Sequence, residues 1–87
     1  MRIDKFLKIS RVIKRRTVAN EICASGRVMI NGKQAKPGSE IREGDIVEIR
    51  FGSGTSRFRV LTVREVVRKN EASELYEILD NPGLLEE

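Results

Sequence analysis

The sequence predicts an α+β fold in which two N-terminal helices pack on a small, mainly antiparallel twisted sheet, with a short helix near the C-terminus. Three observations support this prediction. Apolar residues recur at helical spacing in the first 25 residues, an Asn-Gly dipeptide follows a short alternating stretch, and two later stretches are rich in β-branched residues. At 87 residues the chain fits one domain. We expect this domain to span residues 1–80, followed by an acidic tail at residues 81–87.

Two helices are expected in the first 25 residues. The first, from residue 2 to about residue 10, follows from a face of residues spaced three and four apart, namely Ile3, Phe6, Leu7 and Ser10. A basic turn at residues 11–16 follows, anchored by Val12 and Ile13. Thr17 is a favourable N-cap for the second helix. That helix should end at about Ser25, because Gly26 suits a left-handed stop.

A hairpin is expected after the second helix. Val28 and Ile30 alternate with polar positions, and Asn31-Gly32 suits a two-residue type I′ turn, which needs positive φ at both residues. A return strand should begin at Lys33. Turn signals at residues 37–38 and 43–45 then precede a strand at residues 46–51.

The C-terminal part has a mixed pattern. Residues 52–57 predict a flexible loop, and residues 58–67 predict a longer strand. From Asn70, a plausible cap, apolar residues return to helical spacing and favour a short helix. Residues 76–79 taken alone also fit a strand, so both alternatives stay open for residues 71–80.

Charge is distributed unevenly along the chain. Residues 1–36 hold ten Lys and Arg against two acids, a net charge of +8, whereas residues 37–87 carry −4. This asymmetry predicts a polyanionic partner at the basic end. Cys23 is the only cysteine, which favours a reducing compartment and a role in the core. No run is apolar enough for a membrane span, so we expect a cytoplasmic protein without a membrane partner.

Catalytic signals are missing. The sequence contains no histidine, the commonest general base and metal ligand. Cys23 therefore has no imidazole to activate it. The GSGTS stretch lacks the lysine of a phosphate-binding loop. We expect no enzymatic activity, no cofactor and no metal site.

Four segments in order, RIDKFL, KRRTVANEI, SGRVMINGKQAKP and EGDIVEI, resemble the RNA-binding domain first seen in ribosomal protein S-four. The resemblance covers residues 1–50. It implies the αL RNA-binding motif, in which the helix pair and the adjoining hairpin face RNA. MRIDKFLKISRVIKRR and NEASELYEIL are similar to the small stand-alone RqcP (YabO) family, which is related to the fifteen-kilodalton heat-shock protein. The acidic tail departs from the basic extension of that relative.

This resemblance implies a non-catalytic factor of bacterial ribosome quality control, a monomer when free. Its partners would be large-subunit ribosomal RNA, the P-site peptidyl-tRNA of obstructed large subunits, and the quality-control tailing factor. It would support template-free C-terminal tailing of the stalled chain. Two alternatives remain: a heat-shock-type recycling factor for large subunits that carry nascent chains, and a protein-interaction adaptor that uses the basic face. An RNA-modification enzyme is disfavoured because no catalytic module follows.

The residues expected to contact RNA come from the helix pair and the hairpin. The planar fork of Arg matches phosphate oxygens, and Lys supplies a compact charge. The expected contacts are Arg2, Lys5, Lys8, Arg11, Lys14, Arg15, Arg16, Thr17, Arg27, Asn31, Lys33 and Lys36. Asn31 should act chiefly as a turn-former. Asp4 is either a helix-dipole partner or an acid that orients Arg2 or another cation.

Overall fold

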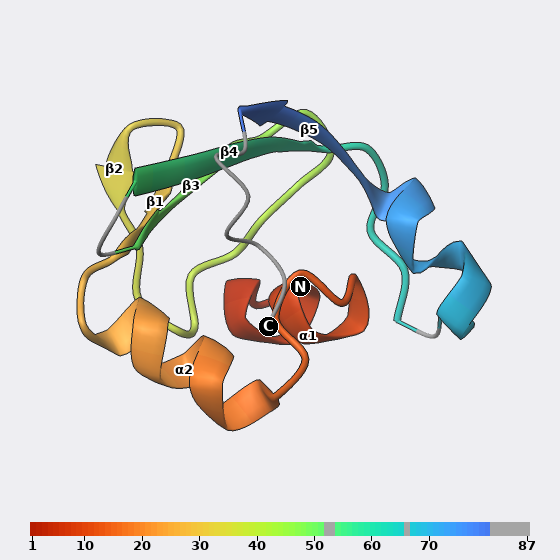
Figure 1. Cartoon of the computed structure of the whole chain (residues 1–87), viewed down its shortest axis with the longest axis horizontal. Helices are drawn as coiled ribbons and strands as arrows, with labels where there is room; N and C mark the ends of the chain where they lie inside the picture. Colours follow the sequence, from red (N-terminus) through yellow and green to blue (C-terminus); the bar gives the residue numbers. More distant parts are fainter. Residues whose placement is uncertain (52–53, 66, 81–87) are drawn as a thin grey trace.

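Two helices cover one face of an antiparallel sheet in the computed structural model, which describes residues 1–51, 54–65 and 67–80 (Figure 1). The helices are α1 (Ile3–Ile9) and α2 (Arg16–Ala24). The strands are β1 (Val28–Ile30), β2 (Lys33–Gln34), β3 (Ile46–Phe51), β4 (Gly54–Val60) and β5 (Tyr76–Asp80), in the order β2-β1-β3-β4-β5. A 3₁₀ helix, η1 (Lys69–Leu75), precedes β5. The predicted α+β class is confirmed.

The start of α2 differs from the sequence prediction. Arg15 is the N-cap, with an extended backbone at φ −116° and ψ 130°, and its carbonyl accepts the Ala19 N–H at 3.0 Å. Thr17 therefore lies inside the first turn, and the prediction that it caps the helix was wrong. A side-chain cap contributes only about 1 kcal/mol. The buried anchors Val12 and Ile13 fix where the chain enters the helix and override that preference.

The end of α2 is as predicted. Gly26 adopts φ +81°, its N–H donates to Cys23, and the N–H of Arg27 donates to Ile22 at 3.2 Å. This pair of bonds is a Schellman motif, which satisfies carbonyls that would otherwise have no partner at the helix end. The motif turns the chain from α2 directly into β1.

The predicted hairpin is also confirmed. Asn31 and Gly32 have φ of 53° and 84°, as a type I′ turn requires. Ile30 pairs with Lys33 across the turn, and β1 also pairs with β3 along its whole length. The hairpin thereby extends the sheet beside the C-terminal end of α2.

The expected loop at residues 52–57 was wrong for residues 54–57, because β4 begins at Gly54; residues 52–53 lie outside the described set. The small residues of this stretch fit the sheet: Ser56 pairs with Ile49 and is completely buried. The strand also ends at Val60, well before residue 67. Gly and Ser favour a flexible loop, but the ladder between β3 and β4, the longest in the sheet, outweighs this local preference.

Residues 71–80 contain both of the structures that the sequence left open, first helix and then strand. Lys69–Leu75 is a 3₁₀ helix whose N-cap is Arg68 rather than Asn70, and Tyr76–Asp80 is a strand. The Tyr76 ring meets Phe58 edge to face, with centroids 5.4 Å apart, and Tyr76 pairs with Val60. These contacts favour the strand over a longer helix. The expected tail at residues 81–87 lies outside the described residues.

The core lies between the inner face of the sheet and the two helices. The predicted face of α1 is buried, and its Phe6 ring stacks on Phe58 of β4, with centroids 6.2 Å apart. Val28, Val47 and Ile49 are also buried on the inner face of the sheet. Leu7 of α1 and Ala19 and Cys23 of α2 belong to the same core, so the core positions the polar side chains near the N-terminal ends of both helices.

Candidate functional site

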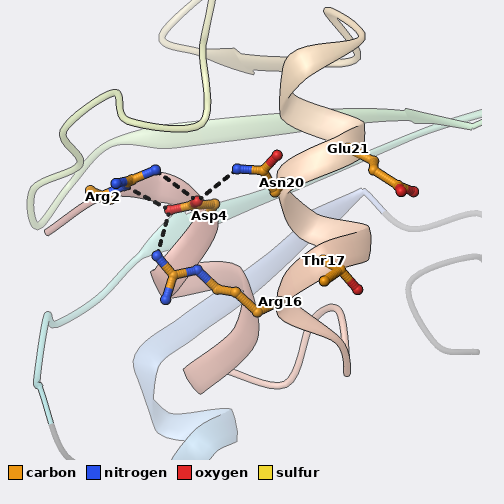
Figure 2. A pocket seen from close by; sticks show the side chains of 6 residues that line it. All are labelled: Arg2, Asp4, Arg16, Thr17, Asn20 and Glu21. Atoms are coloured by element: carbon orange, nitrogen blue, oxygen red, sulfur yellow. Dashed lines mark hydrogen bonds and ion pairs between the residues drawn. The ribbon is translucent and has the colours of Figure 1, made fainter.

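Asp4 is the centre of a polar network between the two helices (Figure 2). Its carboxylate, only 2% exposed, accepts hydrogen bonds from three side chains. Arg2 donates from Nε and Nη2 at 3.2 and 3.1 Å, and Arg16 donates from Nη2 at 3.3 Å. Asn20 donates from Nδ2 at 3.3 Å. One acid thus joins the residue before α1 to the first turns of α2.

The Asp4 carboxylate remains ionised in this setting. Burial by itself would raise its pKa, but the hydrogen bonds from Asn20 and Arg2 and the charge of Arg16 lower the pKa below its usual value. A buried carboxylate is tolerated because it is paired and hydrogen-bonded. The network therefore contains one fixed negative charge and two positive charges.

Both guanidinium groups reach solvent. The side chains of Arg2 and Arg16 are 52% and 46% exposed, although each touches a buried acid. A guanidinium has five N–H donors, and within this network Arg2 uses two of them and Arg16 one. Their remaining donors can bind phosphate oxygens while Asp4 holds their orientation.

The backbone of Arg2 is fixed as well. Arg2 forms an antiparallel bridge with Glu40, while the N–H of Ile3 donates to Ser39 at 2.8 Å. The N–H of Ile41 donates to Met1 at 3.0 Å. The segment that follows the hairpin therefore holds the N-terminus in place, and no local sequence pattern predicts this contact.

A hollow of about 400 Å³ lies at this network. Its lining consists of Arg2, Asp4, Arg16, Thr17, Asn20 and Glu21. Figure 2 shows Asn20 and Arg16 on the side of α2 that faces Asp4, with Thr17 and Glu21 directed away from it. A lining of polar side chains differs from the mainly apolar pockets that bind small molecules. It suits a polar, charged ligand lying on the surface.

Lys5 is directed elsewhere. It forms an ion pair with Glu65, and this contact lowers the pKa of that carboxyl. The pair joins α1 to the segment after β4, across 60 residues. Sequence analysis could not find Glu65 as a partner, because nothing in the pattern of residues 61–68 indicates where that segment packs.

The other predicted cations of the helix pair lie on the connection between helices or on α1. Arg11, Lys14 and Arg15 are exposed, and Lys8 is partly exposed. None of these four has a hydrogen bond or ion pair from its side chain to any residue that the structure describes. Arg11 also has φ +61°, which is uncommon outside glycine.

The hairpin residues divide into two kinds. Arg27, Lys33 and Lys36 are exposed. Asn31 instead uses both ends of its amide inside the protein: Nδ2 donates to Asp45 at 3.0 Å, and Oδ1 accepts the N–H of Ile46 at 3.0 Å. Its predicted role as a turn-former is confirmed, and these two bonds leave one N–H and one lone pair of its amide for other partners.

Asn20 was missed by sequence reasoning. It follows Arg16 by four residues, so the two lie on the same face of α2 and both reach Asp4. Helical spacing from a predicted site residue was the signal that could have found it. Asp4 itself was considered as an orienting acid, and whether it orients arginines for a ligand stays a prediction.

Metal and thiol chemistry find no support among the described residues. They contain no group of three or more His, Cys, Asp or Glu side chains that could hold a metal ion. Cys23 is buried, and burial together with the charge of Asp4 raises its pKa to about 11. No described helix is long and apolar enough to cross a membrane.

Comparison with known proteins gives consistent matches. Residues 1–47 match the family model of the S4 domain. The chain is 54% identical to a Halalkalibacterium halodurans protein named RQC P-site tRNA stabilizing factor, over 90% of this chain and 89% of that protein. A Bacillus subtilis protein of the same name is 45% identical, over 97% and 98%. The trimeric structure of Vibrio cholerae Heat Shock Protein 15 has a TM-score of 0.81 at 29% identity, covering 91% of this chain and 81% of that one.

Proposed function

The chain belongs to the S4 domain family and, within it, to the family of RQC P-site tRNA stabilizing factors, and on this premise we propose that it is a non-catalytic RNA-binding factor of ribosome quality control. It binds large-subunit ribosomal RNA and the P-site peptidyl-tRNA of obstructed large subunits. By holding the tRNA, it supports template-free C-terminal tailing of the stalled chain by the tailing factor. It acts with the ribosome in the cytoplasm and is a monomer when free.

The observation that carries this proposal is the buried carboxylate of Asp4 between two solvent-exposed arginines. Ordering a long side chain on binding costs about 0.5–1.5 kcal/mol. Asp4 restricts Arg2 and Arg16 before the ligand arrives, so less of that cost falls on the complex. The paired guanidinium groups, from two different elements, then contact adjacent positions on an RNA backbone.

Recognition of RNA shape suits this surface better than base stacking. Phe6 and Phe58 are fully buried, and Tyr76 packs against Phe58. These three rings offer little area for stacking nucleobases. Folded RNA is bound mainly through its backbone and its shape, which matches the exposed cations on the helix pair.

The protein contributes binding rather than chemistry. Its sequence contains no histidine, and the raised pKa of the buried Cys23 keeps that thiol protonated near neutral pH. The peptidyl-transfer step of tailing is then carried out by the ribosome. The role of this chain is to keep the tRNA where that step can occur.

Replacement of Arg16 tests the proposal. Arg16→Ala removes one exposed guanidinium from the Asp4 network, and we expect affinity for large subunits that carry peptidyl-tRNA to fall about tenfold, which corresponds to 1.4 kcal/mol. Cosedimentation in sucrose gradients measures the loss. Arg42→Ala is a matched control, because Arg42 is an exposed arginine outside residues 1–36, which carry the excess positive charge. Unchanged cosedimentation after both Arg15 and Arg16 are replaced would defeat the proposal.

Two further measurements separate the alternatives. Cells lacking the protein should lose C-terminal tails on stalled chains. Normal tailing, with binding to subunits retained, would favour the recycling factor, whose heat-shock relatives share the fold. A complex in cell extract that survives RNase would favour the protein-interaction adaptor.

A further inference from the structure

Arg50 of β3 lies across from a second arginine. Val28 of β1 pairs with Ile49 of β3, and the Arg50 N–H donates to the Arg27 carbonyl at 2.8 Å. The antiparallel ladder therefore continues one residue beyond β1 and places Arg27 opposite Arg50. On its other side, Arg50 pairs with Thr55 of β4.

Both arginines belong to the open face of the sheet. Val28 and Ile49 are completely buried on the inner face, and side chains alternate between faces along a strand. Arg27 and Arg50, one position further on, are both exposed. Neither has a hydrogen bond or ion pair from its guanidinium to any residue that the structure describes. By contrast, Arg59 on the same face has Glu77 as a partner at 2.5 Å.

Like charges directly opposite each other destabilise a sheet. Sequences usually avoid such pairs, and the positions where a local rule is broken are often functional. A bound anion would turn this repulsion into attraction. The arrangement of Arg27 and Arg50 therefore favours a negatively charged ligand.

Arg27 and Arg50 lie at the other end of α2 from Arg16 and the Asp4 network. Arg16 begins α2, whereas Arg27 is the last residue of the Schellman motif that ends it, so the two positions are separated by a helix about 13 Å long. In Figure 1, α2 runs from its connection with α1 toward the hairpin strands. Exposed Lys36 adds a third cation nearby, because the N–H of the preceding residue, Ala35, donates to Val28 at 2.8 Å.

We propose that Arg50, with Arg27 and Lys36, forms a second phosphate-binding position for the same RNA, at the opposite end of α2 from the Asp4 network. This inference rests on the proposed function and extends it to the open face of the sheet. It adds a residue from residues 37–87, the part of the sequence with a net negative charge, where charge counting predicts no RNA contact. The hydroxyl of Thr55, beside Arg50 in the ladder, supplies a further donor.

Charge reversal at Arg50 tests the inference. Arg50→Glu should raise the Kd for purified large ribosomal subunits carrying P-site tRNA at least about tenfold, measured by fluorescence anisotropy of labelled protein. In the neutral variant Arg50→Gln, the slope of log K against log salt should decrease by about one, because one phosphate contact is lost. Arg64→Glu is the control: it makes the same charge change at an exposed arginine with no ion pair to a described residue.

Stability provides an independent readout. Arg50→Glu replaces a repulsive pair with an attractive one opposite Arg27, so its Tm should equal or exceed that of the parent protein while binding falls. A merely structural role for Arg50 predicts the reverse, a lower Tm with binding per folded molecule unchanged, and would overturn the inference.

The remaining outcomes also decide the question. Equal losses of affinity in Arg50→Glu and Arg64→Glu would show that only net charge matters and would reject the second position. Retained affinity and salt slope in Arg50→Gln would reject it as well, and if Arg16→Ala still weakens binding, the proposed function stands. If Arg50→Glu, Arg50→Gln and Arg16→Ala all leave binding unchanged, the proposed function itself fails.

Discussion

Asp4 and Arg16 meet across the space between α1 and α2, with Arg16 Nη2 3.3 Å from Asp4 Oδ1. The acid is buried and the guanidinium is nearly half exposed. One end of the contact is therefore fixed by the core, and the other is presented to solvent. This asymmetry distinguishes a positioned arginine from an ordinary surface charge. We therefore expect Asp4 to affect binding in a way that its own negative charge would not predict.

Asp4→Asn should weaken RNA binding even though it raises the net charge by one. The amide cannot pair ionically with Arg2 and Arg16, so both side chains regain rotamer freedom that binding must then remove. We expect affinity for large subunits to fall about tenfold. The free energy of unfolding should fall by about 1–2 kcal/mol, because the arginines are half exposed and solvent weakens these contacts.

Glu40→Gln is the matched control for this prediction. It makes the same change in net charge at an exposed acid, whose partner is the N-terminal ammonium of Met1. Its affinity should equal or slightly exceed that of the parent protein. Tighter binding by Asp4→Asn in the same cosedimentation assay would contradict a positioning role for Asp4 and leave only long-range electrostatics.

Acid should destabilise the protein through Asp4. Because the folded-state pKa lies below the ordinary value of 3.8, the contribution of Asp4 to stability is complete above about pH 4. It is lost as the pH falls through the lowered pKa. Urea unfolding between pH 7 and pH 2 should show this loss, and Asp4→Asn should have a flatter profile. The exposed carboxyl of Glu65 also has a lowered pKa, so some acid dependence should remain in the variant. Identical profiles for both proteins would contradict the prediction.

The elements that could be predicted from sequence are those specified by local chemistry. Gly26 and Asn31-Gly32 adopt the positive φ angles that their residue types favour, and the ends of α2 and β1 follow from them. The Phe6 face of α1 was also predictable, because helical spacing alone specifies it. In each case the information lies within a few residues of the structure it determines.

The errors arose where distant pairing outweighed local preference. Residues 54–57 look flexible in isolation, yet Ser56 is buried opposite Ile49. Tyr76 has a position in a helical pattern, but its contact with Phe58 places it in a strand. The site shows the same division. The cations were identifiable from composition, whereas the bonds from Arg2, Arg16 and Asn20 to Asp4 depend on how α1 packs against α2.

Cys23 should be chemically inert in the folded protein. With a pKa of about 11, roughly one thiol in a thousand is ionised at pH 8, and the side chain is buried. A thiol reagent such as 5,5′-dithiobis(2-nitrobenzoate) should react slowly at pH 8 without denaturant and rapidly in urea. Rapid reaction in the absence of denaturant would contradict this expectation and reopen a redox role for Cys23.

Asn31→Gly should lower stability without weakening RNA binding. Glycine accepts the φ of 53° at this position, but the variant loses the hydrogen bonds to Asp45 and Ile46. We expect the free energy of unfolding to fall by about 1–2 kcal/mol, with affinity for large subunits within about twofold of the parent. Gly32→Ala is the control, because its φ of +84° is strained for alanine while no atom lies within 4 Å of the added Cβ; it reports the cost of the turn backbone alone. A large loss of affinity in Asn31→Gly, at conditions where the variant is fully folded, would instead assign Asn31 a direct contact with RNA.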